Sequence, residues 1–484
     1  MTLQEPSWKK NNLKKKLLLF GAGFYGRNAW AKLHDKYELI GFVDNNLSLS
    51  GTYLCGIPVI SYRELPDYYT DETDIILCTR EYGAISHQLM QLGITSYYVM
   101  LEGLLYYTGP QETMMPVELN DYEYYRKKGP EKNILYIQNA ACIRTHKIAR
   151  IMKDAGYRVF LLYTLAPPND ANRQWADTYD QIWGFSSING IVDFIGNSEF
   201  DLLHCSNEPD LLANIARVTA KPIVFDTHDM QSIRSHVSAE ILALEYLANQ
   251  YADGNLYTSS GAAEIAREKY GLADREVYVL ENRILDPVDI GIPQRKLSEA
   301  DQEIHCVYEG GIVGGNRNHH RYFENIWKEM TSRGIHIHFY SQSDPVYCRQ
   351  LEEQSPYLHY EGNKGSEELV REMTRYDCGL AVFHVTGQNR MFLETGTANK
   401  VYEYLNAQLP VIVGDIQSYV DFVEQYQVGI RLDLAGDIAG QIKEACQIKI
   451  ADDFLQKHGL TMRSSQNELE CFYEKVKRNR SRGK

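Results

Sequence analysis

The chain has few long apolar segments, and this scarcity limits where it can reside. No uninterrupted apolar run in its 484 residues approaches the roughly 20 residues that a membrane-spanning helix requires. The first residues also lack the apolar core of a secretory signal peptide. We therefore expect a soluble, cytoplasmic protein.

Cysteine pairs with the spacing of metal ligands are also absent. The nine cysteines are scattered singly, and their number is odd. Several interrupt apolar runs, as in DIILCTR and DLLHCSN. Buried thiols in a reducing compartment explain this distribution better than a disulfide framework or a zinc site.

Net positive charge is lacking too, since the formal charge is −14 at pH 7. Such a surface would repel a phosphate backbone, so we expect no nucleic-acid partner. Basic residues nevertheless cluster at both ends, in WKKNNLKKK (8–16) and KVKRNRSRGK (475–484). These clusters are either solvated chain ends or contacts with an anionic surface, such as the inner face of a membrane or a charged lipid-linked substrate.

The chain does contain a repeated alternation of apolar strand-like runs and helical segments, which starts three times. Strands that alternate with helices form a mainly parallel sheet covered by helices. The predicted fold class is therefore α/β, with three successive Rossmann-like units. We predict a first unit at 13–107, a linker at 108–132, a second unit at 133–285, a third at 303–450, and a C-terminal helix with a basic tail at 451–484.

The first unit opens with LLLFGAGFYGRNAW, an apolar strand followed by a glycine turn and a helix start. Gly21, Gly23 and Gly26 have the spacing of a dinucleotide-binding turn. Asp44 follows near the distance at which an acidic group can bind a ribose hydroxyl. The pattern predicts binding of NAD(P) or another nucleotide. The alternative is a structural unit with an empty pocket that joins copies of the chain in a homo-oligomer.

Hydride chemistry is not expected from this unit. A short-chain dehydrogenase or dehydratase needs a Tyr-x-x-x-Lys pair beside the nicotinamide, and none occurs up to Tyr107. The glycine turn, LIGFVDNN and LCGIPVIS resemble instead the N-terminal nucleotide-binding module of sugar-nucleotide dehydratases and acyltransferases in polysaccharide pathways. This resemblance implies a nucleotide or sugar nucleotide bound for regulation or channelling.

The segment NKVYEYLNAQLPVIVGD (399–415) resembles the retaining, family-four-like GT-B glycosyltransferases of bacterial surface polysaccharide synthesis. The resemblance implies an acceptor domain at 133–285 and a nucleotide-sugar donor domain at 303–450. It also implies that Glu403 accepts hydrogen bonds from the ribose hydroxyls of the donor, with Asn399 and Lys400 beside it. Lys400 would reach the diphosphate or orient Glu403; the alternative is an exposed Lys–Glu pair on a helix.

The segment VYEGGIVGGNRNHHRYF resembles the glycine loop of the donor domain in these enzymes. Gly310 and Gly311 would let backbone N–H groups approach the diphosphate, and an arginine would bind it bidentately. By position Arg317 is the first candidate for that arginine and Arg321 the second. The alternative is a simple turn.

On the acceptor side, the resemblance places two strand ends, DLLHCSNEPDLL and PIVFDTHDM, at the cleft between the domains. His228 would hydrogen-bond the sugar or the acceptor, and Asp229 would orient that histidine or accept a proton. These two are the predicted catalytic residues. The further cleft candidates are Arg144, His146, Asn207 and Glu208.

The resemblance implies front-face displacement with retention of configuration and no metal, and the chain has no Asp-x-Asp motif of metal-dependent sugar transferases. Many relatives carry a further glutamate where this chain has Thr395. The predicted function is transfer of a sugar from a nucleotide sugar of unknown base to a glycan, lipid-linked or protein acceptor. The alternatives are a GT-B-like sugar-nucleotide epimerase and a nonenzymatic nucleotide-sugar sensor or partner subunit.

Overall fold

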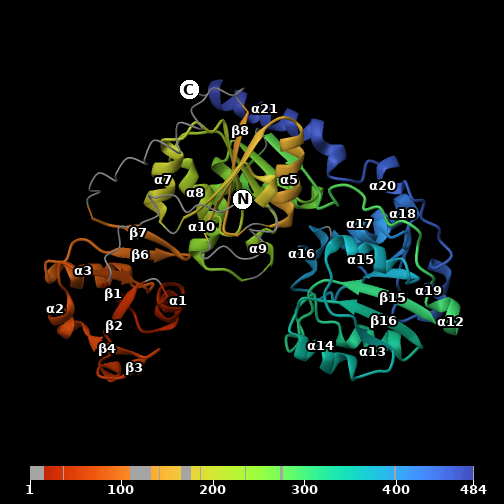
Figure 1. The fold of residues 1–484 in the computed structure, drawn as a ribbon, viewed down its shortest axis with the longest axis horizontal. Coiled ribbons are helices and arrows are strands. Elements are labelled where there is room, and N and C mark those ends of the chain that lie inside the picture. The colour runs from red at the N-terminus through yellow and green to blue at the C-terminus, as the bar shows by residue number, and fades with distance from the viewer. Residues whose placement is uncertain are drawn as a thin grey trace. The chain divides into compact units, whose positions relative to one another are not determined.

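The computed structural model describes residues 16–35, 37–109, 132–140, 142–164, 176–185, 187–234, 236–272, 276–396 and 399–482. The chain divides into two compact units, Met1–Ala149 with Gly156–Val224, and Arg150–Ala155 with Phe225–Lys484. Three parallel-dominated sheets follow one another along the sequence (Figure 1). These sheets confirm the predicted α/β class with three Rossmann-like units. The predicted linker lies outside the described residues except at 108, 109 and 132.

The first sheet has the strand order β3-β4-β2-β1-β5-β6-β7. Its strands are β1 (Lys16–Phe20), β2 (Glu38–Asp44), β3 (Tyr53–Leu54), β4 (Ile57–Ser61), β5 (Thr73–Leu77), β6 (Tyr98–Leu101) and β7 (Leu104–Tyr107). Its helices are α1 (Phe24–Leu33), α2 (Leu65–Tyr68) and α3 (Tyr82–Gln91). The apolar run of β1 is buried on both faces, because alternate residues join two separate core clusters.

Strands β6 and β7 form an antiparallel hairpin at the edge of this sheet. Glu102 and Gly103 join them, and both residues have positive φ. Two successive residues with positive φ are what a tight type I′ hairpin turn requires.

The second sheet has the order β10-β9-β8-β11-β12-β13-β14. Its strands are β8 (Asn133–Gln138), β9 (Arg158–Tyr163), β10 (Gln181–Gly184), β11 (Leu202–Ser206), β12 (Ile223–Thr227), β13 (Gly254–Tyr257) and β14 (Glu276–Val279). The helices between them are α5 (Ile143–Asp154), α7 (Ile188–Gly196), α8 (Leu211–Arg217), α9 (Gln231–Arg234), α10 (Ala239–Tyr251) and α11 (Ser260–Tyr270).

The third sheet is parallel throughout and has the order β17-β16-β15-β18-β19-β20. Its strands are β15 (Ile304–Glu309), β16 (Ile335–Tyr340), β17 (Leu358–Tyr360), β18 (Cys378–Ala381), β19 (Val411–Val413) and β20 (Gly429–Arg431). Helices before and between these strands are α12 (Ser298–Asp301), α13 (Glu324–Thr331), α14 (Pro345–Glu352), α15 (Ser366–Met373), α16 (Arg390–Glu394), α17 (Asn399–Asn406) and α18 (Gln417–Tyr426). Helices α19 (Ile438–Ala445), α20 (Phe454–Lys457) and α21 (Gln466–Arg482) follow.

A single apolar core joins the third sheet to its helices. Trp327, Tyr404 and Phe339 belong to it and are almost fully buried. Helix α17 contributes Val401, Tyr404 and Leu405 to this core, so that its remaining face is left for polar residues.

Among the described residues, no helix is both long enough and apolar enough to cross a membrane.

Candidate functional site

The third sheet reverses its strand order between β15 and β18. In doubly wound sheets, ligands bind at this switch point, just outside the carboxyl ends of the strands. Gly310 follows β15 directly, and Val382 follows β18. The predicted donor residues can therefore be judged by whether they gather at this point.

Gly310 and Gly311 turn the chain at the end of β15. Gly310 has φ +123°, a conformation that residues with side chains rarely adopt. A Cβ atom on Gly310 would lie 3.3 Å from Lys400 Nζ, and one on Gly311 would lie 2.6 Å from a guanidinium nitrogen of Arg321. The Tyr308 hydroxyl donates a hydrogen bond to the Gly311 carbonyl oxygen at 2.8 Å. Two cations thus lie against the backbone of a fixed glycine turn.

Lys400 is the second residue of α17, and its ammonium is enclosed by aromatic rings. Nζ lies 3.8 Å from the ring centroid of Tyr308 and 5.1 Å from that of Phe383. Burial lowers the pKa of Lys400 to about 7; the positive charge of Arg321 also lowers it, and the carboxylate of Glu309 opposes the shift. A bound diphosphate would stabilise the buried ammonium, because its negative charge compensates the positive charge of the lysine.

The structure separates the two candidate arginines of the glycine loop. Arg321 lies at Gly311, beside Lys400. Arg317 lies near the Tyr322 phenol, where its charge opposes the rise in the pKa of Tyr322 that burial causes, and both arginines are exposed. The geometry therefore favours Arg321 over Arg317 at the glycine turn, the reverse of the order suggested by sequence position.

Glu403 lies one turn after Lys400 on α17 and is half-buried. Within the described part of the chain, its carboxylate has neither an ion pair nor a hydrogen bond, so the alternative of an exposed Lys400–Glu403 pair is not formed. Asn399, at the start of the helix, has a buried Oδ1 atom that finds no hydrogen-bond partner among the residues that the structure describes. Buried polar groups are normally satisfied, and a bound ligand is one way to satisfy this one.

Thr395 stands where many relatives of the GT-B family carry a glutamate. Its hydroxyl donates a hydrogen bond to the Phe392 carbonyl oxygen at 2.8 Å, at the end of α16. The neighbouring Glu394 accepts a hydrogen bond from the Ser418 backbone N–H at 3.3 Å and forms an ion pair with Arg390 at 3.5 Å. Both side chains thus have partners within their own domain, and the Thr395 carbonyl oxygen accepts a hydrogen bond from the Ser259 hydroxyl at the start of α11.

His228 follows the end of β12 and is paired with a carboxylate that the sequence analysis did not select. His228 Nε2 lies 3.2 Å from Asp226 Oδ2, and the Asp226 side chain is fully buried. Asp229 forms an ion pair with Arg234 instead, at 3.2 Å. Asp226 therefore orients the histidine. The signal was available, since residues two apart on an extended strand point to the same side.

Arg144 and His146 lie in the first turn of α5, not in the loop before it, and have separate surroundings. Arg144, in the first turn of α5, is 3% exposed. The next side chain, Thr145, places its hydroxyl 3.0 Å from that of Ser206 at the end of β11. His146 Nδ1 lies 3.0 Å from the Thr178 hydroxyl. Arg144 is thus held at the strand-order reversal of this sheet, between β8 and β11, whereas His146 contacts the segment before β10.

Asn207 and Glu208 follow the end of β11. Asn207 is 8% exposed. Burial raises the pKa of Glu102 in the β6–β7 turn, and the negative charge of Glu208 adds to this rise. Asn207 is buried directly after β11.

His320 was not selected from the sequence and lies close to both cations. Its ring stacks on that of His319, with centroids 4.4 Å apart, and lies 5.4 Å from the Phe392 ring. Burial lowers the pKa of His320 to about 3, and the charges of His319, Arg321 and Lys400 contribute. His320 is therefore a neutral imidazole beside Arg321 and Lys400. The pair His319–His320 directly before Arg321 is the sequence feature that could have indicated this residue.

The three glycines of the first unit have different steric roles. A Cβ atom on Gly26 would lie 1.8 Å from the Gly21 carbonyl oxygen, and one on Gly21 would lie 2.7 Å from the Cys78 carbonyl oxygen. A Cβ atom on Gly23 would meet nothing within 4 Å. Packing thus requires Gly21 and Gly26, while Gly23 leaves open space at the start of α1, where a phosphate would approach.

Asp44 connects the end of β2 to this glycine turn. Its Oδ2 accepts a hydrogen bond from the Ala22 backbone N–H at 2.7 Å, and its Oδ1 accepts one from the Asn46 N–H at 2.8 Å. Each carboxylate oxygen has a second lone pair. Asp44 therefore stabilises the turn and still has acceptor capacity for a ribose hydroxyl.

Comparison with known families identifies part of the chain. Residues 313–452 match the family model described as glucosyltransferase 3-like, C-terminal domain. This region thus resembles a glucosyltransferase domain and is called the glucosyltransferase-like domain below. It contains Arg321, Lys400 and Glu403, and it begins just after the glycine turn. The expectation of a glycosyltransferase is confirmed by this match. Residues 13–100 match a second model, described as C2185-like, N-terminal.

Solved structures of low sequence identity also resemble the chain, whereas no curated protein sequence matches it. Anabaena Alr3699/HepE in complex with UDP is 12% identical, with a TM-score of 0.47, over 72% of this chain and 98% of that protein. AviGT4, a glycosyltransferase involved in avilamycin A biosynthesis, is 14% identical, with a TM-score of 0.44 and the same coverage. A Listeria monocytogenes protein described as a UDP-N-acetylglucosamine 2-epimerase is 10% identical, with a TM-score of 0.42, over 72% and 91% of the two chains.

Proposed function

We propose that the glucosyltransferase-like domain binds a nucleotide sugar at the end of β15, and that the protein transfers the sugar to a glycan, lipid-linked or protein acceptor. The observation that carries this proposal is the approach of Lys400 and Arg321 to the Gly310–Gly311 backbone at the strand-order switch. Backbone N–H groups together with two cations form a site for a diphosphate.

The remaining donor residues extend this site along α17. Glu403 lies one turn beyond Lys400 and would accept hydrogen bonds from the adjacent ribose hydroxyls, as an ionised carboxylate can. The Asn399 side chain, with its buried and unpartnered oxygen, would bind a donor hydroxyl. Arg317, which lies by Tyr322, would contact only the outer edge of the nucleotide.

We propose that transfer retains the configuration of the sugar and uses no metal at the diphosphate. The bond from the anomeric carbon to the diphosphate oxygen breaks while the acceptor oxygen bonds to the same face of that carbon. The acceptor proton passes to an oxygen of the leaving diphosphate. Lys400 and Arg321 would stabilise the charge that develops on the leaving group, the task that a metal ion performs in other transferases.

Acceptor binding is assigned to the second sheet. His228, held by the buried Asp226, would hydrogen-bond the transferred sugar or the acceptor hydroxyl. Arg144, in the first turn of α5, and Asn207, directly after β11, are both buried and would contact an anionic or hydroxylated acceptor. Asp229, His146 and Glu208 have other partners and would contribute less.

The setting that fits this activity is bacterial surface polysaccharide synthesis in the cytoplasm or at the inner membrane face. The first unit would bind a nucleotide, with the phosphate at Gly23 and the ribose at Asp44. Its role would be regulation or delivery of a sugar nucleotide. The open space at Gly23 supports this part of the proposal.

A panel of UDP-, GDP-, dTDP- and CMP-sugars, each with and without candidate acceptors, tests the proposal. Acceptor-dependent release of the nucleoside diphosphate supports transfer. Conversion of the sugar without an acceptor would indicate the epimerase, and binding without turnover would indicate the sensor.

The role of Glu403 is tested by comparing a ribonucleotide with its 2′-deoxy analogue. The wild-type protein should bind the ribonucleotide more tightly by about tenfold, a typical value for a hydrogen bond to a charged group. Glu403→Gln should bind both forms with similar, weakened affinity. The matched control is Glu424→Gln on the exposed side of α18, which should keep the discrimination. Unchanged discrimination in Glu403→Gln would remove Glu403 from the ribose site.

A further inference from the structure

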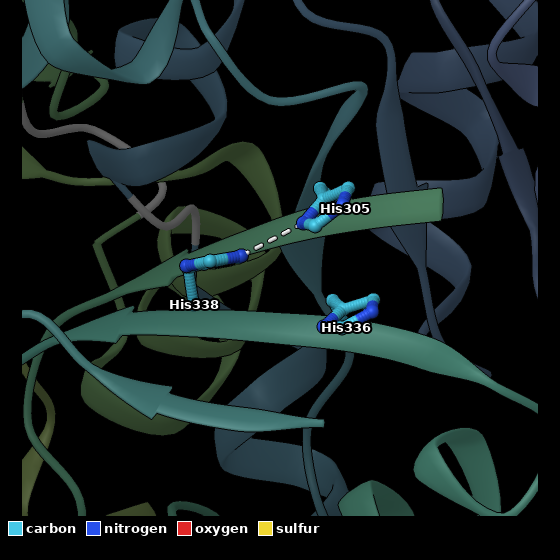
Figure 2. A group of neighbouring side chains, drawn as sticks. All are labelled: His305, His336 and His338. Carbon is cyan, nitrogen blue, oxygen red and sulfur yellow. Dashed lines mark hydrogen bonds between the residues drawn. The ribbon is translucent and has the colours of Figure 1, made fainter. Parts of the chain in front are cut away.

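Four histidines lie on three neighbouring strands of the third sheet. His305 is on β15, His336 and His338 are on β16, and His359 is on β17. His305 is in register with His336, and His338 is in register with His359. Register partners in a sheet, and residues two apart on one strand, lie on the same face. All four rings therefore share one face, and Figure 2 shows three of them on their two strands.

The ring nitrogens of these histidines face one another in pairs. His305 Nδ1 lies 2.9 Å from His338 Nε2, and His336 Nδ1 lies 2.8 Å from His359 Nε2. The rings of His305 and His336 stack at 4.3 Å, and those of His338 and His359 at 4.4 Å. One ligand nitrogen from each of His305, His336 and His338 lies within 4.8 Å of the other two.

The outer nitrogens of three rings contact carboxylates. His305 Nε2 lies 3.0 Å from Asp301 Oδ2, and His338 Nδ1 lies 2.7 Å from Glu361 Oε1. Histidines that bind a metal almost always donate the other ring N–H to a carboxylate or carbonyl group, which fixes the tautomer and turns the lone pair toward the ion. The carboxylates here thus leave the inner nitrogens as ligands.

His336 completes this pattern with the third carboxylate. Its Nε2 lies 2.5 Å from Glu303 Oε2, so that its Nδ1 is the inner nitrogen. Asp301, Glu303 and Glu361 come from three different segments: the end of α12, the residue before β15, and the residue after β17. Each of the three metal-facing histidines thus has its own carboxylate.

We propose that His305, His336 and His338, with His359 beside them, bind one divalent transition-metal ion of the zinc class. Imidazole nitrogens suit Zn²⁺, whereas Mg²⁺ and Ca²⁺ prefer oxygen ligands. Tetrahedral zinc with its usual bond lengths places ligand nitrogens about 3.3 Å apart. The paired nitrogens would therefore separate by a few tenths of an ångström from their present 2.9 and 2.8 Å, and the His336 ligand nitrogen, which lies within 4.8 Å of those of His305 and His338, would move toward them.

The role of this metal is structural. His305 is the second residue of β15, while the glycine turn follows the last residue of the same strand, Glu309. The metal and the donor site thus occupy opposite ends of β15. An ion held by His305, His336 and His338 would join β15 and β16, with His359 of β17 beside it, and these three strands form one edge of the sheet.

The test measures bound metal in the full-length protein carrying no polyhistidine tag. Metal is first removed with a chelator, Zn²⁺ is added, and loosely bound ions are removed with a weak competing chelator before elemental analysis. We expect about one Zn²⁺ per chain and a melting temperature that rises with Zn²⁺ but not with Mg²⁺. His336→Ala should lose the zinc. His458→Ala, an exposed histidine of the same unit, should retain it.

Glu303→Gln keeps all four histidine rings. It therefore tests the metal site even if the His336→Ala protein fails to fold. Loss of such a carboxylate typically weakens metal affinity about 10–100-fold. Co²⁺ in place of Zn²⁺ should give visible absorption bands of a tetrahedral ion, and Glu303→Gln should weaken them. Less than a tenth of an equivalent of zinc in the wild-type protein, or equal zinc affinity in wild-type, His336→Ala and Glu303→Gln proteins, would overturn the proposal. Neither measurement depends on sugar transfer.

Discussion

Lys400 Nζ lies 3.8 Å from the centroid of the Tyr308 ring. A residue of α17 thus lies against the second-to-last residue of β15. The Tyr308 hydroxyl donates a hydrogen bond to the Gly311 carbonyl oxygen. One tyrosine thus positions both the cation and the glycine turn of the proposed diphosphate site. The predictions for Lys400 depend on this arrangement.

The pH dependence of nucleotide binding should follow Lys400. Its pKa in the free protein is lowered to about 7, so above that pH the ammonium loses its proton before a ligand binds. Nucleoside diphosphate binding then requires proton uptake, and the dissociation constant should rise about tenfold per pH unit above 7. Calorimetry in buffers of different ionisation enthalpy measures this uptake. A dissociation constant that is flat from pH 7 to 9 would contradict the assignment.

The same group affects folding with a defined sign. Between pH 7 and the ordinary lysine pKa of 10.5, the unfolded chain binds a proton at Lys400 that the folded chain lacks. The free energy of unfolding should therefore increase with pH over this range, relative to Lys400→Met. Denaturant titrations of both proteins at pH 7 and pH 9 measure the difference. A stability difference independent of pH would show that the buried lysine keeps its proton.

His228 should depend on Asp226 and not on Asp229. Asp226→Asn removes the carboxylate that holds the ring, and His228→Gln removes the ring itself. If the imidazole transfers a proton or binds the reacting sugar, each change should lower kcat about 100-fold or more. Asp229→Asn, which removes the carboxylate of the ion pair with Arg234, is the matched control and should change kcat less than threefold. A larger effect for Asp229→Asn would reverse these roles.

Much of this fold was predictable because its strands are apolar runs buried on both faces. The run Leu17–Phe20 and the alternation around β15 and β16 therefore located the sheets. The hairpin strand β7 was not predicted, since it depends on the pairing of the short segment Leu104–Tyr107 with β6. Pairing partners are a tertiary property that periodicity does not reveal.

The candidate site was predictable where a local motif carries it and not where it depends on loop geometry. Gly310 and Lys400 meet as the resemblance implies. Arg317 and Arg321 are four residues apart in an irregular loop, and their order could not be judged without coordinates. The histidine cluster was missed for a different reason. His305 and His336 become neighbours only through strand register, so their spacing along the chain has no motif.

The glycines of the first unit provide a matched pair of substitutions. Gly26→Ala places a Cβ atom against the Gly21 carbonyl oxygen and should reduce stability by about 1–3 kcal/mol or more. Gly23→Ala meets no atom and should leave the melting temperature nearly unchanged, but its methyl group occupies the space of the expected phosphate. Thermal unfolding and titration with nucleotides, NAD(P) and sugar nucleotides measure both effects. Normal nucleotide binding by Gly23→Ala would show that no phosphate lies at this turn.

Release of nucleoside diphosphate from the nucleotide-sugar panel, compared between wild-type, Lys400→Met and Lys328→Met proteins, tests the central claim most directly. Lys328 is an exposed lysine of α13 and serves as the control. We predict acceptor-dependent release by the wild-type and Lys328→Met proteins and a rate about 100–1000-fold lower for Lys400→Met, as when one stabilising group at a developing charge is lost. Equal release by Lys400→Met would contradict the account.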